Sequence, residues 1–99
     1  MKKEVLLTIL YDYYGDLLSD KARVYFEAYY FDNLSLGEIA LNLNVSRNAV
    51  HKQLKSMEEE LNFYELKLHL FEKDVKLQKI IDKMPDNKQK KDLKEMMNL

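Results

Sequence analysis

The sequence predicts an all-α protein in which a helix-turn-helix leads into a long helix that forms a dimer seam. The composition indicates helices, because the 99 residues include only two glycines and one proline, with 46% hydrophobic and 33% charged residues. A helix-turn-helix pattern occupies residues 35–55, and an apolar repeat of 3.5 residues continues to position 75. These three observations together define the predicted fold class.

Two helices are expected before the helix-turn-helix. The first should cover residues 3–17, and its apolar stripe is formed by Val5, Leu6, Ile9, Leu10 and Tyr13. Ser19 and Asp20 provide a cap for the second helix, expected over residues 20–31. Its apolar side is predicted to hold Val24, Ala28 and Phe31, broadened by neighbouring aromatic residues. These aromatics could stack nucleotide bases, but a helical position favours packing in the core.

The helix-turn-helix pattern combines two apolar helix faces with a small residue at Ala40, a turn residue and an N-cap, all at the correct spacing. Ser35 and Glu38 form a capping box, so that a helix begins at Leu36. Asn44 stands where the turn needs a residue that tolerates left-handed backbone, and Ser46 is a suitable N-cap for the second helix. The inward face of the pair is predicted to contain Leu36, Ile39, Ala40, Leu43, Ala49, Val50 and Leu54.

The outward face of the second motif helix holds the candidate nucleic-acid-binding residues. These are Ser46, Arg47, Asn48, His51, Lys52 and Lys55. Ser46 and the amides at the helix start would hold a phosphate, and the basic side chains would add charge toward the backbone. Asn48 and His51 would approach base edges in the major groove. The alternative for each residue is a solvated surface side chain.

The second motif helix is expected to continue to about residue 75, giving one long helix over 47–75. Apolar residues recur with the 3.5-residue spacing typical of helices that lie along other helices, at Val50, Leu54, Met57, Leu61, Tyr64, Leu68, Phe71 and Val75. A stripe about 40 Å long exceeds what so short a chain can cover. A homodimer is therefore favoured, with a seam of Met57, Leu61, Tyr64, Leu68, Phe71 and Val75. The alternative is packing against the first helix of the same chain.

Domain organisation follows from the end of this pattern. Residues 1–84 are expected to form a single helical domain, because Pro85, Asp86 and Asn87 interrupt the helix. Residues 85–99 then form a tail containing a short, weakly held helix. The alternative is that the lysines of this tail contact nucleic acid.

The charge distribution argues against a strong, free-standing DNA-binding protein. The net charge is −1, but residues 1–62 carry 7 basic and 10 acidic residues, whereas residues 63–99 carry 9 and 7. Nucleic-acid affinity depends largely on neutralising phosphates, and a basic domain is therefore expected. The half that contains the helix-turn-helix is instead acidic.

No residue pattern in the sequence indicates an active site or a cofactor site. The sequence has no cysteine, and its two histidines, His51 and His69, lack metal-ligand spacing. Gly15 and Gly37 are too far apart for a phosphate-binding loop. We therefore expect a non-enzyme without metal or cofactor. Because no signal peptide or membrane-spanning run is recognised, the protein is expected in the cytoplasm without membrane insertion.

The segment 25–55 resembles region 4 of sigma-70 factors, through motifs such as Glu38-Ile39-Ala40 and Val45-Ser46-Arg47. More closely, residues 5–70 resemble the YlxM-type helix-turn-helix family, with a match that extends from Leu10-Tyr11-Asp12-Tyr13-Tyr14-Gly15 to Lys67-Leu68-His69-Leu70. The resemblance implies an all-helical, non-enzymatic protein with a dimerising helix. That family is encoded beside signal recognition particle genes, which implies a regulatory or accessory role in this pathway. At the position of His51 the family usually has tyrosine, and the segment after Val75 varies.

Three hypotheses for the function remain. The protein is an accessory or regulatory component of the signal recognition particle pathway that contacts the particle's RNA or its GTPase. Alternatively, it is a sequence-specific transcriptional regulator that binds duplex DNA as a homodimer. A third alternative is a protein-interaction scaffold without nucleic-acid binding. The acidic balance of the helix-turn-helix half favours the first of these.

Overall fold

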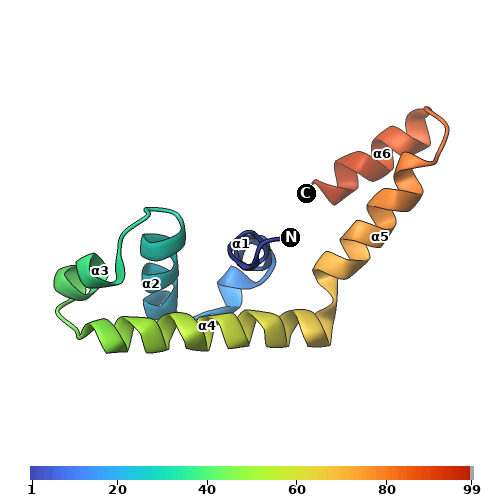
Figure 1. Cartoon of the computed structure of the whole chain (residues 1–99). Coiled ribbons are helices and arrows are strands. Elements are labelled where there is room, and N and C mark those ends of the chain that lie inside the picture. The colour runs from blue at the N-terminus through green and yellow to red at the C-terminus, as the bar shows by residue number, and fades with distance from the viewer. Residues whose placement is uncertain (99) are drawn as a thin grey trace. The chain divides into compact units, whose positions relative to one another are not determined.

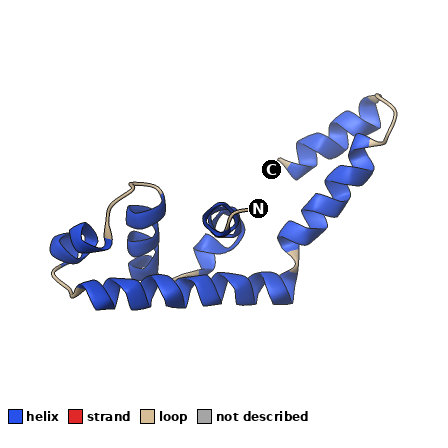
Figure 2. Ribbon diagram, viewed as in Figure 1, coloured by secondary structure: helices blue, strands red, loops and turns tan. Residues whose placement is uncertain are grey.

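The computed structural model describes residues 1–98, and within this range it contains six α-helices, one short 3₁₀-helix and no strand (Figure 2). The predicted all-α fold class is confirmed. The chain divides into two compact units, Met1–Leu68 and His69–Leu99. Each unit is described by itself.

The first unit is built on one long helix. Its elements are α1 (Lys3–Tyr14), η1 (Gly15–Leu17), α2 (Asp20–Tyr30), α3 (Leu36–Leu43) and α4 (Arg47–Leu68). Helices α1, α2 and α3 each contact α4 and follow one another along it (Figure 1). The core of this unit therefore lies between α4 and the three shorter helices.

The core face of α1 differs from the predicted stripe. Leu7, Leu10, Tyr11 and Tyr14 are buried, whereas Val5 is 48% exposed. Only Leu10 belongs to both sets. The prediction for this helix was therefore wrong, because the buried face is shifted by one residue around the helix relative to the predicted stripe. The physical reason is aromatic packing, because the ring of Tyr11 stacks on Phe26 of α2 with centroids 4.2 Å apart. A face that includes the large tyrosine rings buries more apolar surface than one centred on Val5.

Helix α2 begins as predicted, but its core face is the aromatic one. The Ser19 hydroxyl accepts a hydrogen bond of 3.1 Å from the amide of Ala22, which confirms the predicted cap. Tyr25 and Phe26 are buried in the core. Val24 and Phe31 were expected on the apolar side, and both are about half exposed. Two of the aromatic residues considered for base stacking thus pack inside the protein.

The predicted continuous helix over 47–75 is wrong, because α4 ends at Leu68 and α5 begins at Leu70. His69 separates them with φ 57° and ψ 27°, a left-handed conformation that costs roughly 1–2 kcal/mol for a residue with a Cβ atom. Neither glycine nor proline marks this position in the sequence. The imidazole Nδ1 of His69 lies 3.0 Å from Oε2 of Glu72, so the side chain interacts with the first turn of α5.

The second unit contains α5 (Leu70–Asp82) and α6 (Lys88–Met97), which contact each other. Asn87 caps α6, since its side-chain oxygen accepts a 2.9 Å hydrogen bond from the amide of Lys90. The unit boundary after Leu68 differs from the expected domain 1–84 with a tail at 85–99. The short helix expected in that tail is present, and none of its residues is buried.

In the described part of the chain, none of the helices has both the length and the apolar character required to cross a membrane.

Candidate nucleic-acid interface

The first motif helix, α3, begins with the predicted capping box. The Ser35 hydroxyl accepts a hydrogen bond of 3.1 Å from the amide of Glu38, and the Ser35 amide donates one of 3.1 Å to the Glu38 carboxylate. Two amides at the helix start, which have no intrahelical acceptor, are thereby satisfied. This local arrangement fixes where α3 begins.

The turn between α3 and α4 also has the predicted conformation. Asn44 adopts φ 54° and ψ 48°, the left-handed geometry that ends α3. The amide of Val45 then donates a hydrogen bond of 3.0 Å to the carbonyl of Ala40. The Ser46 hydroxyl accepts a hydrogen bond of 3.0 Å from the amide of Ala49, so Ser46 is the N-cap of α4.

The two motif helices pack through small and branched side chains. Ile39 and Ala40 of α3 and Val50 and Leu54 of α4 are all buried. Leu43 was expected to face inward, but its side chain is 37% exposed, so that part of the prediction was wrong. Because Ala40 is small, it allows the helices to approach closely, and the outer face of α4 is held in a fixed orientation.

All six predicted nucleic-acid-binding residues lie together at the start of α4. The side chains of this set, called here the α4 face, are exposed, and none of them forms an ion pair within residues 1–98; its members are Ser46, Arg47, Asn48, His51, Lys52 and Lys55. The α4 face therefore has its charged groups available to a partner.

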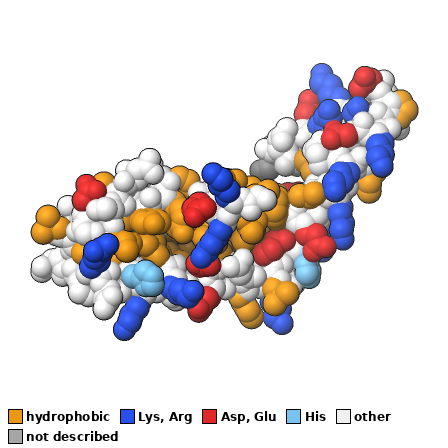
Figure 3. Space-filling view, viewed as in Figure 1, with side chains coloured by type: hydrophobic (Ala, Val, Ile, Leu, Met, Phe, Trp, Pro, Cys, Tyr) orange, Lys and Arg blue, Asp and Glu red, His pale blue; other side chains and the backbone are white. Residues whose placement is uncertain are grey.

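The segment that carries this face holds basic residues without any carboxylate. Residues 39–57 contain three basic residues and no carboxylate, whereas the rest of residues 1–68 carries 5 basic and 11 acidic residues. Figure 3 shows basic and histidine side chains over the first part of α4, with acidic side chains nearer its middle. The α4 face is thus a local basic patch on a unit that is acidic overall, a feature that the charge of the whole half conceals.

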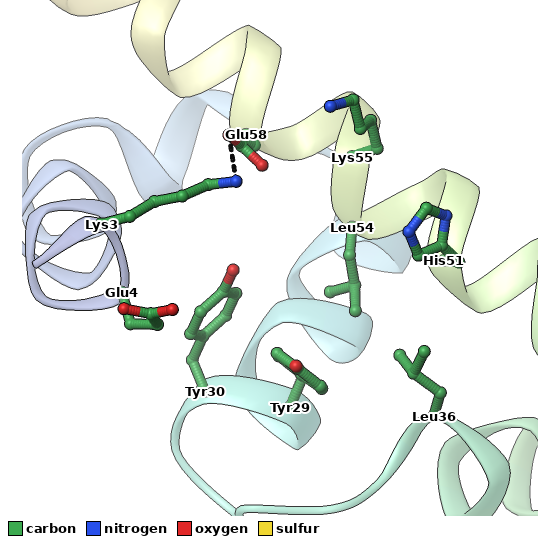
Figure 4. Close-up of a pocket in the computed structure, with 9 residues that line it drawn as sticks. All are labelled: Lys3, Glu4, Tyr29, Tyr30, Leu36, His51, Leu54, Lys55 and Glu58. Atoms are coloured by element: carbon green, nitrogen blue, oxygen red, sulfur yellow. Dashed lines mark ion pairs between the residues drawn. The ribbon is translucent and has the colours of Figure 1, made fainter.

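A groove of about 320 Å³ lies beside the α4 face. Helix α1 contributes Lys3 and Glu4 to its lining, α2 contributes Tyr29 and Tyr30, and α4 contributes the face from His51 to Glu58 (Figure 4). Burial, with the nearby carboxylates of Glu58 and Glu4, raises the pKa of the Tyr30 phenol. The sequence did not indicate Lys3 and Glu4, because no local pattern reports which distant helix start packs beside α4; the aromatic residues of α2 were considered there as base-stacking residues, with core packing favoured.

The predicted dimer seam needs a correction at its beginning. Met57 and Leu61 are 1% and 0% exposed, because the core of the first unit covers them. Tyr64 is half-buried, and its hydroxyl donates a hydrogen bond of 2.9 Å to Glu60. Leu68 and Val75 are 44% and 38% exposed, and Phe71 is half-buried. The alternative of an intrachain core therefore holds for the first half of the apolar repeat, and the seam remains a prediction for its second half.

Within residues 1–98, no three histidine, cysteine, aspartate or glutamate side chains come together as a group able to hold a metal ion. His51 lies on the α4 face, and His69 contacts Glu72 in the second unit.

Comparison with known proteins gives consistent matches over most of the chain. The sequence model of the family described as "Putative helix-turn-helix protein, YlxM / p13 like" matches residues 1–99. A UPF0122 protein of Caldanaerobacter subterraneus subsp. tengcongensis is 46% identical over 82 residues, which cover 83% of this chain and 70% of that protein. A UPF0122 protein of Geobacillus is 42% identical, with 87% and 78% covered. One from Lacticaseibacillus casei is 46% identical, with 72% and 63% covered.

Proposed function

Because this chain belongs to the YlxM / p13-like helix-turn-helix family, we propose that it binds duplex nucleic acid through the α4 face. The observation that supports this proposal most strongly is the charge distribution. Three basic side chains and no carboxylate occupy residues 39–57 of a unit whose remainder is strongly acidic. A packing motif alone gives no reason for such a separation, whereas phosphate binding requires it.

In this proposal the start of α4 binds the nucleic-acid backbone. The amides of Arg47 and Asn48 precede the first intrahelical hydrogen bond, so they can donate to a phosphate at the positive end of the helix dipole. The Ser46 oxygen already accepts a bond from Ala49, which leaves its hydroxyl proton for the same phosphate. Arg47, Lys52 and Lys55 add charge toward neighbouring phosphates.

The same orientation presents Asn48 and His51 to base edges. Asn48 follows Arg47 in the first turn, and His51 lies one turn further along α4. An asparagine amide can bind adenine with two hydrogen bonds, which is worth roughly 1–3 kcal/mol of discrimination. These two side chains would therefore supply any sequence preference, and the basic side chains would supply affinity.

We assign this binding to a regulatory or accessory role in the signal recognition particle pathway, as the family resemblance implies. We propose that the α4 face contacts the particle's RNA or its GTPase, because a small basic patch is sufficient for a limited contact. The acidic remainder of the first unit would repel a long run of duplex DNA, so it supports a partner that meets only the α4 face. The alternative is a sequence-specific transcriptional regulator. The protein acts in the cytoplasm, without catalysis or a cofactor.

A homodimer is proposed as the working form, with Tyr64, Leu68, Phe71 and Val75 in the contact. The support is exposure, because Leu68 and Val75 are large apolar residues that remain substantially accessible within the chain. Two copies would present two α4 faces to one duplex.

The test is binding of the purified protein to fluorescent duplex DNA and to signal recognition particle RNA, measured by anisotropy at low salt. Arg47→Ala and Lys52→Ala should each weaken binding, and Lys21→Ala on α2 is a matched control with the same loss of charge. A preference for the particle's RNA supports the accessory role, and a preference for one DNA sequence supports the regulator. If neither nucleic acid binds, the protein-interaction scaffold replaces both.

A further inference from the structure

An ion pair joins the start of α1 to the middle of α4. The ammonium Nζ of Lys3 lies 2.8 Å from Oε1 of Glu58, and the two side chains are 61% and 22% exposed (Figure 4). This interaction raises the pKa of Lys3 above its ordinary value, because the carboxylate stabilises the charged ammonium. Lys3 and Glu58 are therefore oppositely charged at neutral pH.

Glu58 lies directly after the α4 face, where its charge affects how closely phosphates can approach. Arg47, His51, Lys55 and Glu58 are separated by 4, 4 and 3 residues, which places them along one side of the helix. Residues 39–57 contain no carboxylate, so Glu58 is the first negative charge that a phosphate backbone would meet along α4. An unpaired carboxylate there would repel phosphates beside Lys55.

Two other carboxylates lie nearby and form no ion pair within residues 1–98, although the Glu4 carboxylate also attracts the ammonium of Lys3. Glu4 lines the same groove, and Glu59 follows Glu58 on α4. Neither forms an ion pair in the described part of the chain, whereas Glu58 does. Along α4, the first carboxylate after the α4 face is thus the one that Lys3 of α1 neutralises.

We propose that Lys3 is a positioning residue of the nucleic-acid interface, which acts by neutralising Glu58 and so extends the surface that phosphates can approach beyond Lys55. This inference rests on the proposed function of the α4 face. It gives α1, which lies outside the helix-turn-helix, a part in nucleic-acid binding. Lys3 acts through Glu58 and makes no phosphate contact of its own.

The test measures the effect of Lys3→Ala on duplex binding in two backgrounds. With Glu58 present, Lys3→Ala should weaken binding at low salt by about threefold, because one unpaired negative charge is created beside the interface. In the Glu58→Gln background, the loss caused by Lys3→Ala should be much smaller, since the carboxylate that pairs with Lys3 is gone and only its Coulombic attraction to Glu4 remains. In the Glu59→Gln background, which removes a neighbouring charge without an ion pair to Lys3, the threefold loss should persist.

Equal losses from Lys3→Ala with and without the Glu58→Gln substitution would overturn the inference, because they would show direct contact or a general charge effect. The absence of any loss in both would overturn it as well. Circular dichroism and unfolding midpoints of each variant establish that the fold is retained. Failure of the proposed function itself is recognised separately, because the wild type would then not bind or Arg47→Ala would have no effect, and the inference would fall with it.

Discussion

The phenolic hydroxyl of Tyr14 donates a hydrogen bond of 2.5 Å to the carboxylate of Glu65, which lies 51 positions later in the chain. This contact holds the last turn of α1 against α4, and the ion pair between Lys3 and Glu58 holds the first turn. Helix α1 is therefore fixed on α4 at both ends. The orientation of α1 determines whether Lys3 can reach Glu58.

Replacement of Tyr14 by phenylalanine should lower the free energy of unfolding by about 1–2 kcal/mol. Tyr14 is buried, and loss of its hydroxyl leaves the partly buried Glu65 carboxylate without this donor. Urea denaturation measures the change. Tyr29→Phe removes a hydroxyl from a more exposed ring and should cost less than about 0.5 kcal/mol. Equal costs for the two variants would contradict the role of the Tyr14–Glu65 bond.

Loss of the Ser46 cap should destabilise the first unit. Ser46→Ala removes the acceptor for the amide of Ala49 and should cost about 1 kcal/mol in urea denaturation. Ser56→Ala is the matched control, because Ser56 is exposed in the interior of α4, where alanine is a good helix former. Equal effects of the two substitutions would contradict the role of Ser46 as the N-cap of α4.

The interactions around Glu72 should be visible in an acid titration. Hydrogen bonding and charge attraction from Lys76, and then from His69, lower the pKa of Glu72 below its ordinary value. Its contribution to stability is therefore fully present above the ordinary glutamate pKa and is lost as the pH falls through the lowered value. Carboxyl NMR should place the Glu72 midpoint below the ordinary value, and Lys76→Ala should raise it. A midpoint unaffected by Lys76→Ala would contradict this assignment.

The proposed dimer predicts a solution mass of two chains, each of 11.9 kDa, in light scattering after size exclusion. Leu68→Glu should shift the protein to a monomer, because it places a charge at the proposed contact. Leu41→Glu is the control, since Leu41 is 83% exposed on α3 and lies outside the proposed seam. A wild-type mass of one chain at micromolar concentration, or an equal effect of both substitutions, would contradict the proposed dimer.

Local signals predicted the helix-turn-helix accurately. The Ser35–Glu38 capping box, the left-handed Asn44 and the Ser46 cap all depend on interactions within a few residues, and all three are confirmed. The family resemblance was also correct. Such features can be derived from sequence because the side chain and its backbone partner are neighbours in the chain.

Features that depend on distant partners were harder to predict. The rotation of α1 follows from the stacking of Tyr11 on Phe26, and the apolar repeat on α4 does not reveal that Met57 and Leu61 are covered by the same chain. The break at His69 has no glycine or proline to mark it. Similarly, the pairing of Lys3 with Glu58 has no local signal, because it depends on how α1 packs against α4.

The salt dependence of duplex binding tests the central claim about the α4 face most directly. Affinity should fall linearly with salt on a double-logarithmic plot, because bound phosphates release counterions. If Lys52 contacts one phosphate, Lys52→Ala should make the slope shallower by about 0.9, and Lys21→Ala should leave it unchanged. A wild-type slope near zero, or identical slopes for Lys52→Ala and Lys21→Ala, would contradict nucleic-acid binding through the start of α4.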